Sequence, residues 1–149
     1  MDAMALPVND RCPVARSLTI LGQKWTLLVL REAFFGRTRF AEFSRIGIPS
    51  DVLTARLGSL VEAGILERSP YREGGGRVRD EYLLTAAGRD VLPVVAALSQ
   101  WGREHLPAAE ASTMRALRDA DDEPVRLAFV DSRGEVVAGR DVVLRRLVG

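Results

Sequence analysis

The apolar residues of the chain recur mostly at helical spacing, and glycines separate one helical stretch from the next. Residues 12–22 carry apolar side chains three and four positions apart, begin with a proline in the first turn and stop at Gly22. Residues 24–36 are apolar on nearly every side, which is typical of a helix at the centre of a core. The first third of the chain therefore predicts a short amphipathic helix followed by a buried one.

Two short helices are expected next, with a tight glycine-containing turn between them. The segment 38–47 is expected to begin at Thr38, and the segment 50–64 is expected to begin at Ser50 and to end at Gly64. Each places apolar side chains on one side, which are Phe40, Phe43 and Ile46 in the first and Leu53, Leu57 and Leu60 in the second. This pattern predicts a helix-turn-helix.

The other side of the second helix carries unusually small residues, Ala55 and Gly58. A glycine inside a helix costs about 0.5–1 kcal/mol relative to alanine, so Gly58 needs a reason. Docking in the major groove of DNA supplies one, because it brings the helix backbone close to bases and phosphates. The alternative is a solvated helix that tolerates both residues. For DNA binding, the groups expected to read bases are Ser50, Asp51 and Thr54, with Arg56 on the flank beside a phosphate.

Residues 65–84 have the pattern of a β-hairpin. Two strand-like runs flank the triple glycine 74–76, and three arginines cluster there, Arg72, Arg77 and Arg79. A hairpin directly after a helix-turn-helix is the wing of a winged helix, and arginines at its tip suit the minor groove or the DNA backbone. A solvated basic loop is the alternative. Arg39, at the start of the first helix of the motif, is a further candidate phosphate anchor.

A long helix is expected after Thr85, with Pro93 as a kink inside it. Its apolar side exceeds what a winged domain can cover, so a two-fold interface with a second subunit is expected. The predicted interface residues are Val14, Leu18 and Leu21 of the first helix and Val91, Val94, Val95, Leu98 and Trp101 of the long one. The alternative is that the long helix packs only on its own domain.

The tail divides into a charged stretch and a second hairpin. Residues 108–124 are expected to form a linker or a surface helix, and short β-like runs flank the DSRG turn at 131–134. The expected domains are 12–106 for DNA binding and dimerisation, and 107–149 for a linker and an extension. The fold class is α+β, mainly α: a winged helix-turn-helix with N-terminal and long C-terminal dimerisation helices and a small C-terminal β-hairpin.

The amino-acid composition narrows the classes of function that are expected. The 149 residues are 47% apolar and 28% charged, which is globular, and no apolar run approaches a membrane span or a secretory leader. A cytoplasmic protein is therefore expected. With one cysteine and one histidine, we expect no internal disulfide, no metal site and no cofactor. His105 has no catalytic partner at motif spacing, and no glycine motif for nucleotides follows a strand, so we expect no enzyme.

The formal net charge of +1 does not by itself indicate a nucleic-acid partner, so the argument for double-stranded DNA depends on where the arginines lie. The rival hypothesis is a winged helix that binds protein and has no specific DNA target. Acidic Asp51 on the reading face, and Glu73 and Asp80 near the wing tip, favour this rival. The arginines of the wing favour DNA.

Three stretches of the chain resemble the HxlR-type winged helix-turn-helix transcriptional regulators over residues 12 to about 106. They are CPVARSLTILGQKWTLLVLREAFFGRTRFAEF, PSDVLTARLGSLVEAGILER and YLLTAAGRDVLPVVAALSQWG. Specific pieces include Cys12-Pro13, the GQKW of 22–25, Leu53-Thr54 and Trp101-Gly102. The resemblance implies a homodimeric DNA-binding regulator with one recognition helix per subunit in successive major grooves of a pseudo-palindromic operator, and repression as the commoner outcome.

The resemblance also concerns regulation. In several members of that family the cysteine before the N-terminal proline senses oxidants or electrophiles, and Cys12 stands at that place. The alternative is a free cysteine that acts as a small apolar group. A small-molecule effector is a further expectation, and the space between the long helices of a dimer is where its site would lie.

Overall fold

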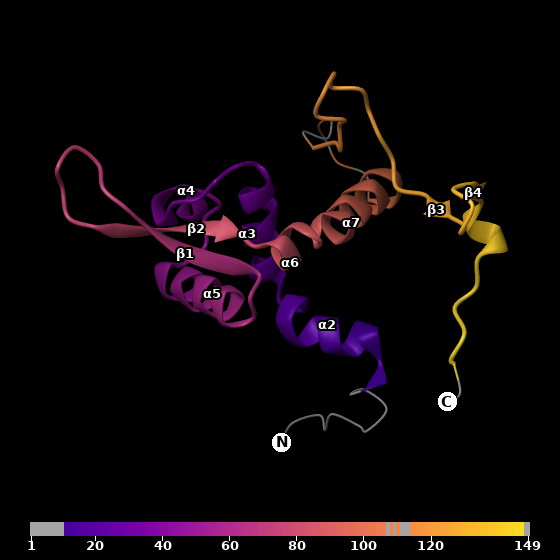
Figure 1. The fold of residues 1–149 in the computed structure, drawn as a ribbon, viewed down its shortest axis with the longest axis horizontal. Helices are drawn as coiled ribbons and strands as arrows, with labels where there is room; N and C mark the ends of the chain where they lie inside the picture. The colour runs from indigo at the N-terminus through magenta and orange to yellow at the C-terminus, as the bar shows by residue number, and fades with distance from the viewer. Residues whose placement is uncertain (1–10, 107, 109, 111–113, 148–149) are drawn as a thin grey trace. The chain divides into compact units, whose positions relative to one another are not determined.

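The computed structural model describes residues 11–106, 108, 110 and 114–147 (Figure 1). Helices come first, with α2 at Pro13–Leu21, α3 at Lys24–Phe34, α4 at Phe40–Ser44 and α5 at Ser50–Glu62. The hairpin of β1 and β2 follows at Leu66–Tyr71 and Arg79–Leu84. Then come α6 at Ala86–Arg89, α7 at Leu92–His105, the short strands β3 and β4 at Phe129–Val130 and Val136–Val137, and a 3₁₀ turn, η1, at Gly139–Asp141.

These elements form two compact units, of which the first ends at Val95 and the second begins at Ala96. The sequence instead predicts a boundary after residue 106. The difference arises because most of α7 packs with the residues that follow it, as described below for the interface. Pro107 itself lies outside the described residues.

The core of the first unit lies around α3 and α5. The described apolar side chains that are buried there include Val29, Leu30 and Ala33 of α3, Phe43 of α4, and Leu53, Leu57 and Leu60 of α5. Helix α3 is thus the central helix that its apolar sequence predicts. The predicted stripe of α4 is only partly correct, because Phe40 is 36% exposed and Phe43 alone reaches the core. Burying one such side chain stabilises the fold by about 1.5–3 kcal/mol.

Helix α5 ends in a Schellman motif, in which the backbone turns sharply toward β1. The Gly64 amide donates to the Val61 carbonyl at 3.0 Å, and the Ile65 amide donates to the Leu60 carbonyl at 2.9 Å. Gly64 has φ +74°, a backbone conformation that glycine adopts without steric cost. Gly64 therefore ends the helix, as its position in the sequence predicts.

The starts of α4 and α5 differ from the prediction by one residue each. The N-caps are Arg39 and Pro49, not Thr38 and Ser50. At α4 the carboxylate of Glu42 accepts the backbone N–H groups of Thr38 at 2.9 Å and of Arg39 at 3.0 Å. These two hydrogen bonds lower the pKa of Glu42, because they stabilise its ionised form. The side chain of Glu42, inside the helix, thus caps α4, whereas the sequence predicts that Thr38 does so.

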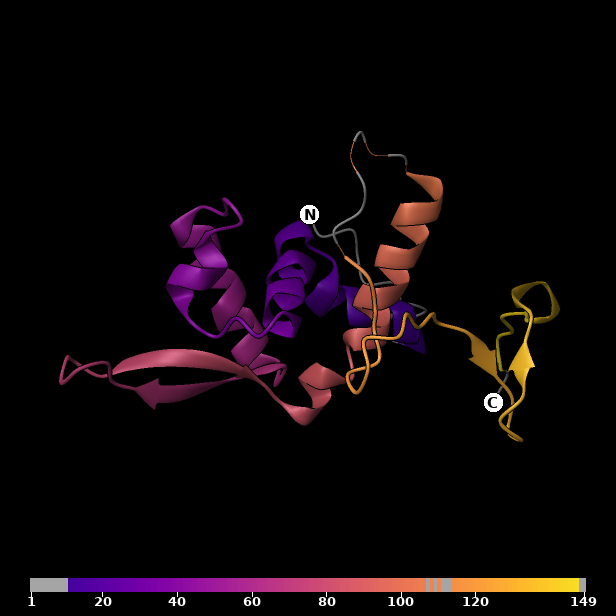
Figure 2. The same cartoon turned by 90° about the horizontal axis from the view of Figure 1, so that it is seen from above.

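The hairpin is antiparallel and pairs Leu66 with Leu84 at its base and Tyr71 with Arg79 at its outer end. A third short segment joins it, because Arg39 bridges to Glu81 and the Tyr82 amide donates to the Thr38 carbonyl at 2.7 Å. Figure 2 shows helices α3, α4 and α5 on one side of this hairpin, with its tip extending beyond them. This is a winged helix-turn-helix, so the predicted fold class is confirmed.

The long helix expected after Thr85 is broken in two. Thr85 does cap a helix, since its hydroxyl oxygen accepts the Gly88 amide at 3.0 Å, but that helix is α6 and ends at Arg89. Pro93 lies in the first turn of α7, not in the middle of a continuous helix. Proline lacks an N–H and disfavours helical backbone in the residue before it, so the chain ends one helix and starts another.

The tail forms turns and short strands. Strands β3 and β4 pair around the predicted DSRG turn, in which the Asp131 carboxylate accepts the amides of Arg133 at 2.8 Å and Glu135 at 3.0 Å. Residues 114–124 are not helical: Leu117 bridges to Pro124 in an antiparallel turn. The part of the predicted linker or surface helix at 109 and 111–113 lies outside the described residues.

Two glycines of the first unit give opposite predictions. A Cβ added at Gly88 would lie 2.1 Å from the Ile65 carbonyl oxygen, whereas a Cβ at Gly58 would meet nothing within 4 Å. Gly88→Ala should therefore destabilise the protein by about 3 kcal/mol. Gly58→Ala, the matched control, should stabilise it by about 0.5–1 kcal/mol. Urea unfolding measures both. Equal shifts of the two midpoints would show that α6 does not pack closely on the end of α5.

Candidate nucleic-acid interface

Helix α5 presents the predicted reading face to solvent. Leu53, Leu57 and Leu60 are at most 1% exposed and point into the core. Successive residues turn by about 100° around a helix, so the opposite side faces outward. Ser50, Asp51, Thr54 and Ala55 are all exposed, and the Thr54 hydroxyl donates to the Ser50 carbonyl at 2.9 Å. The first turn of α5 thus offers small polar groups to an incoming surface.

Gly58 has no packing reason inside the subunit. It lies within α5, and the space where its Cβ would stand is open. An alanine there would fit and would make the helix more stable. The small residues of this face are therefore unexplained by the fold of one subunit and suit a surface that approaches the helix backbone closely.

The wing tip carries exposed positive charge. Arg72, Arg77 and Arg79 are exposed, and in the part of the chain that the structure describes none of them takes part in an ion pair. Gly74 and Gly75 have φ of +52° and +76°, so the tight reversal of the chain depends on glycine. The tip is therefore a loop whose sharp turn leaves its arginines free for phosphate.

Arg39 lies beside the same wing and already has partners. Its guanidinium forms an ion pair with Glu73 of the wing tip and stacks on the Tyr71 ring, 4.3 Å from the ring centroid. The hydrogen bond that Arg39 donates to the Glu73 carboxylate raises the pKa of Arg39. Sequence reasoning missed Tyr71 and the pairing role of Glu73, because these residues are more than thirty positions from Arg39 and no local pattern links them.

Arg56 is also held within the subunit. Its guanidinium donates to the side-chain oxygen of Gln23, the N-cap residue of α3. Its Nε is buried and has no hydrogen-bond partner among the described residues. Arg56 therefore links α5 to the start of α3, and a phosphate contact would need its outer nitrogens to change partner.

The predicted dimer residues fall into two groups. Val14 and Leu18 of α2 and Val94, Leu98 and Trp101 of α7 are exposed, and Leu21 is partly exposed. Val91 and Val95 are 8% and 6% exposed and belong to the subunit's own core. For these two residues the sequence pattern is misleading, because the helical break before Pro93 turns them toward the domain instead of leaving them on an outer stripe.

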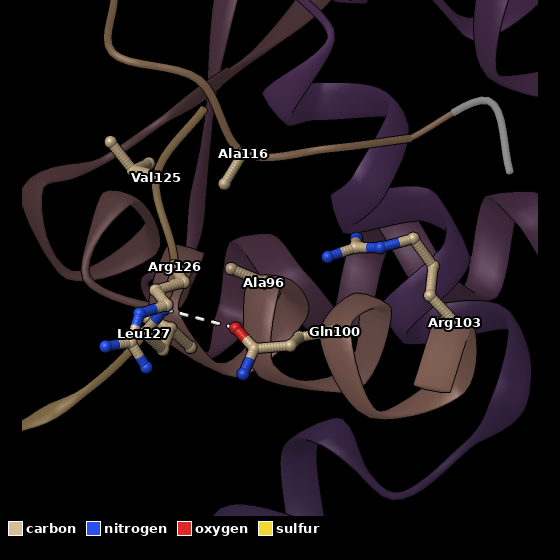
Figure 3. Close-up of a pocket in the computed structure, with 7 residues that line it drawn as sticks. All are labelled: Ala96, Gln100, Arg103, Ala116, Val125, Arg126 and Leu127. Carbon is tan, nitrogen blue, oxygen red and sulfur yellow. Dashed lines mark hydrogen bonds between the residues drawn. The ribbon is translucent and has the colours of Figure 1, made fainter. Parts of the chain in front are cut away.

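One face of α7 is covered by the residues that follow it. The side-chain oxygen of Gln100 accepts the Leu127 amide at 3.2 Å (Figure 3). Arg103 donates to the Met114 carbonyl at 3.1 Å. Gln100, Arg103 and Leu127 are among the residues that, with Ala96, line a small pocket of about 50 Å³. This volume suits water or a small ion more than an organic effector. Leu98 and Trp101 project from the opposite side of α7, which this segment leaves open.

Cys12 is the N-cap residue of α2 and is partly exposed. Its carbonyl accepts the Arg16 amide at 3.0 Å, while its side chain makes no capping hydrogen bond. Within the described residues, no group of histidine, cysteine and acidic side chains could hold a metal ion. No described helix is both long and apolar enough to cross a bilayer.

Comparison with known proteins gives the family. The HxlR-like helix-turn-helix family matches residues 20–110. An uncharacterized HTH-type transcriptional regulator of Mycobacterium bovis is 47% identical over 131 residues, covering 87% of this chain and 82% of the relative. The crystal structure of PA1607, a protein proposed to be a transcription factor, has a TM-score of 0.77 at 37% identity and covers 91% of this chain and 94% of its own.

A second solved structure is similar over a shorter length. The redox regulator HypR in its oxidized form is 33% identical with a TM-score of 0.58, and the match covers 65% of this chain and all of HypR. The family match at residues 20–110 spans the helix-turn-helix, the wing and α7. The chain therefore belongs to the HxlR-like helix-turn-helix family of transcriptional regulators.

Proposed function

We propose that the protein is a homodimeric repressor that acts in the cytoplasm and binds a pseudo-palindromic operator in double-stranded DNA. The observation that carries this proposal is the outer face of α5. Its inner stripe is buried, its first turn is exposed and polar, and its interior glycine has open space beside it. These three properties together suit a helix that docks in the major groove.

We assign the reading of bases to the first turn of α5. Ser50 and Thr54 carry hydroxyls that both donate and accept hydrogen bonds, and the Asp51 carboxylate accepts from the amino group of cytosine. Helix α5 is 13 residues long, roughly 20 Å at 1.5 Å per residue, so it spans the groove with its N-terminal end inward. Sequence preference is therefore assigned to Ser50, Asp51 and Thr54.

We assign the affinity for DNA to the arginines around that helix. Arg77 and Arg79 lie on the wing, which extends beyond the helices, and they reach the DNA backbone or the adjacent minor groove (Figure 2). Arg39 and Arg56 anchor phosphates once they exchange Glu73 and Gln23 for phosphate oxygens. One subunit offers too few phosphate contacts for useful affinity, which favours binding as a dimer.

The proposed dimer uses the exposed apolar faces of α2 and α7. Val14, Leu18, Val94, Leu98 and Trp101 are each more than 40% exposed, and Leu21 adds to the α2 face. An apolar surface that is exposed in one subunit and buried in two is the usual basis of a two-fold interface. An effector, where one acts, would bind between the α7 helices of the pair.

The rival function is a winged helix that binds protein. Acidic groups near the interface favour it, but the structure pairs one of them, Glu73, with Arg39. Fluorescence anisotropy separates the two functions. Full-length protein is titrated against the duplex upstream of its own gene and against a scrambled duplex, each over a salt series. A preference of at least about 10³-fold for the native duplex supports a specific repressor, and equally weak binding to both supports the rival.

Two substitutions should separate affinity from specificity. Arg77→Ala should weaken binding to every duplex and reduce the slope of log affinity against log salt by about 1, because one phosphate contact is lost. Thr54→Ala should leave that slope unchanged and alter the ranking of operator variants. The same anisotropy titrations measure both. An unchanged salt slope for Arg77→Ala would show that the wing does not contact DNA.

Glu73→Gln should strengthen binding. The substitution removes a negative charge from the wing tip and frees Arg39. The salt slope should steepen by about 1 for the scrambled duplex, on which Arg39 otherwise stays with Glu73, and should change less for the native duplex, on which Arg39 already contacts phosphate in the proposed complex. Glu67→Gln is the matched control, since Glu67 is also an exposed acid and lies near the base of β1. If both substitutions raise affinity equally, general charge and not the Arg39 pairing is responsible.

We also propose that oxidation of Cys12 regulates operator binding. The chain has a single cysteine, so a disulfide forms either between two subunits or with a small thiol. Two thiols lose two electrons and two protons to an oxidant such as diamide, which becomes the hydrazine. Diamide should release the native protein from its operator, and a thiol reductant should restore binding. Cys12→Ser should not respond, and an equal response in both proteins would remove the sensor hypothesis.

A further inference from the structure

Two arginines that are assigned to phosphate contacts have partners of different charge. The partner of Arg39 is the carboxylate of Glu73, so this pair carries no net charge. The partner of Arg56 is the side-chain amide oxygen of Gln23, which is neutral. The Arg56 pair therefore keeps one full positive charge that attracts phosphate from a distance, whereas the Arg39 pair does not.

No nearby acid compensates the charge of Arg56. None of the ion pairs among the described residues includes this arginine. Side chains three and four positions apart on a helix are neighbours, and on α5 those of Arg56 are all uncharged: Val52, Leu53, Ser59 and Leu60. The buried Nε has no partner among the described residues either. The guanidinium is thus held only by a neutral hydrogen bond.

The surface around this pair is positive as well. Gln23 is exposed, Arg56 is partly exposed, and the exposed Lys24 follows Gln23 directly. In the part of the chain that the structure describes, Lys24 has no acidic partner. The first turn of α3, which begins here, adds the partial positive charge of a helix N-terminus. A polyanion therefore meets an uncompensated cation at this point.

We infer that Gln23 is a positioning residue that sets how strongly the protein binds random DNA, which rests on the proposed binding of DNA. Arg56 exchanges only a neutral partner for a phosphate oxygen, so it gains this contact on any duplex. Arg39 must leave a carboxylate and gains its contact on the operator. A glutamate in place of Gln23 would neutralise Arg56 as Glu73 neutralises Arg39, and would thereby raise specificity.

Gln23→Glu in the full-length protein tests this role in the anisotropy titrations. A negative side chain is tolerated at the exposed start of a helix, so the variant should fold. The slope of log affinity against log salt should fall by about 1 for the scrambled duplex and should change less for the native duplex. The preference for the native duplex should rise about threefold, which is roughly what one phosphate contact contributes over a fourfold range of salt.

Two further variants separate the new charge from the lost hydrogen bond. Gln23→Met has a similar size, accepts no strong hydrogen bond and carries no charge, so both salt slopes should stay as they are in the unsubstituted protein. In an Arg56→Ala protein, Gln23→Glu has no arginine to neutralise and should leave the scrambled-duplex slope of that protein unchanged. Equal urea midpoints for Gln23→Glu and the unsubstituted protein show that the fold is retained.

The outcomes distinguish this inference from the function on which it rests. A slope that falls equally for both duplexes, or falls equally in the Arg56→Ala protein, overturns the role of Gln23, because general charge then explains the effect. A scrambled-duplex slope that Gln23→Glu leaves unchanged overturns it too, while a retained preference for the native duplex leaves the specific repressor standing. An unsubstituted protein without that preference overturns the proposed function itself.

Discussion

The burial of one stripe of α5 is the constraint on which the functional surface depends. Leu53, Leu57 and Leu60 are all but fully enclosed, and each contributes about 1.5–3 kcal/mol that a rotated helix would lose. A rotation of one residue position, about 100°, would bury Thr54 and expose leucine. The core therefore fixes which residues of α5 face outward. The reading face is exposed and polar because the opposite face is not.

The wing depends on a second constraint, at the point where α5, the hairpin and α6 meet. The Thr85 amide donates to the Ile65 carbonyl at 3.1 Å, and the Thr85 hydroxyl oxygen accepts a hydrogen bond from the Gly88 amide. Gly88 lies so close to Ile65 that a side chain would not fit. This junction closes the base of β1 against β2 and so sets the direction in which the wing leaves the domain. A glycine that is buried by close packing, Gly88, and a glycine with open space beside it, Gly58, thus occur in one small fold.

The sequence predicts what local patterns determine. The helices, the hairpin around the triple glycine and the DSRG turn follow from periodicity and turn chemistry within a few residues. Prediction from the sequence fails where the structure depends on groups that are distant along the chain. Glu42 takes over the capping of α4, Pro93 begins a helix because α6 has already ended, and Arg39 and Arg56 find partners more than thirty positions away. The outward residues of α5 are predictable, whereas the pairing of the arginines is not.

The pairing of those arginines has a consequence for specificity. Any duplex attracts free cations, so each arginine that is already neutralised lowers the affinity for random sequence. In the proposed complex, Arg39 leaves Glu73 once contacts made by the first turn of α5 hold a phosphate beside it. The low net charge of +1 also keeps the affinity for random sequence low. A regulator that competes against a genome of other sites is better served by this arrangement than by an evenly basic surface, because what matters is the ratio of specific to non-specific binding.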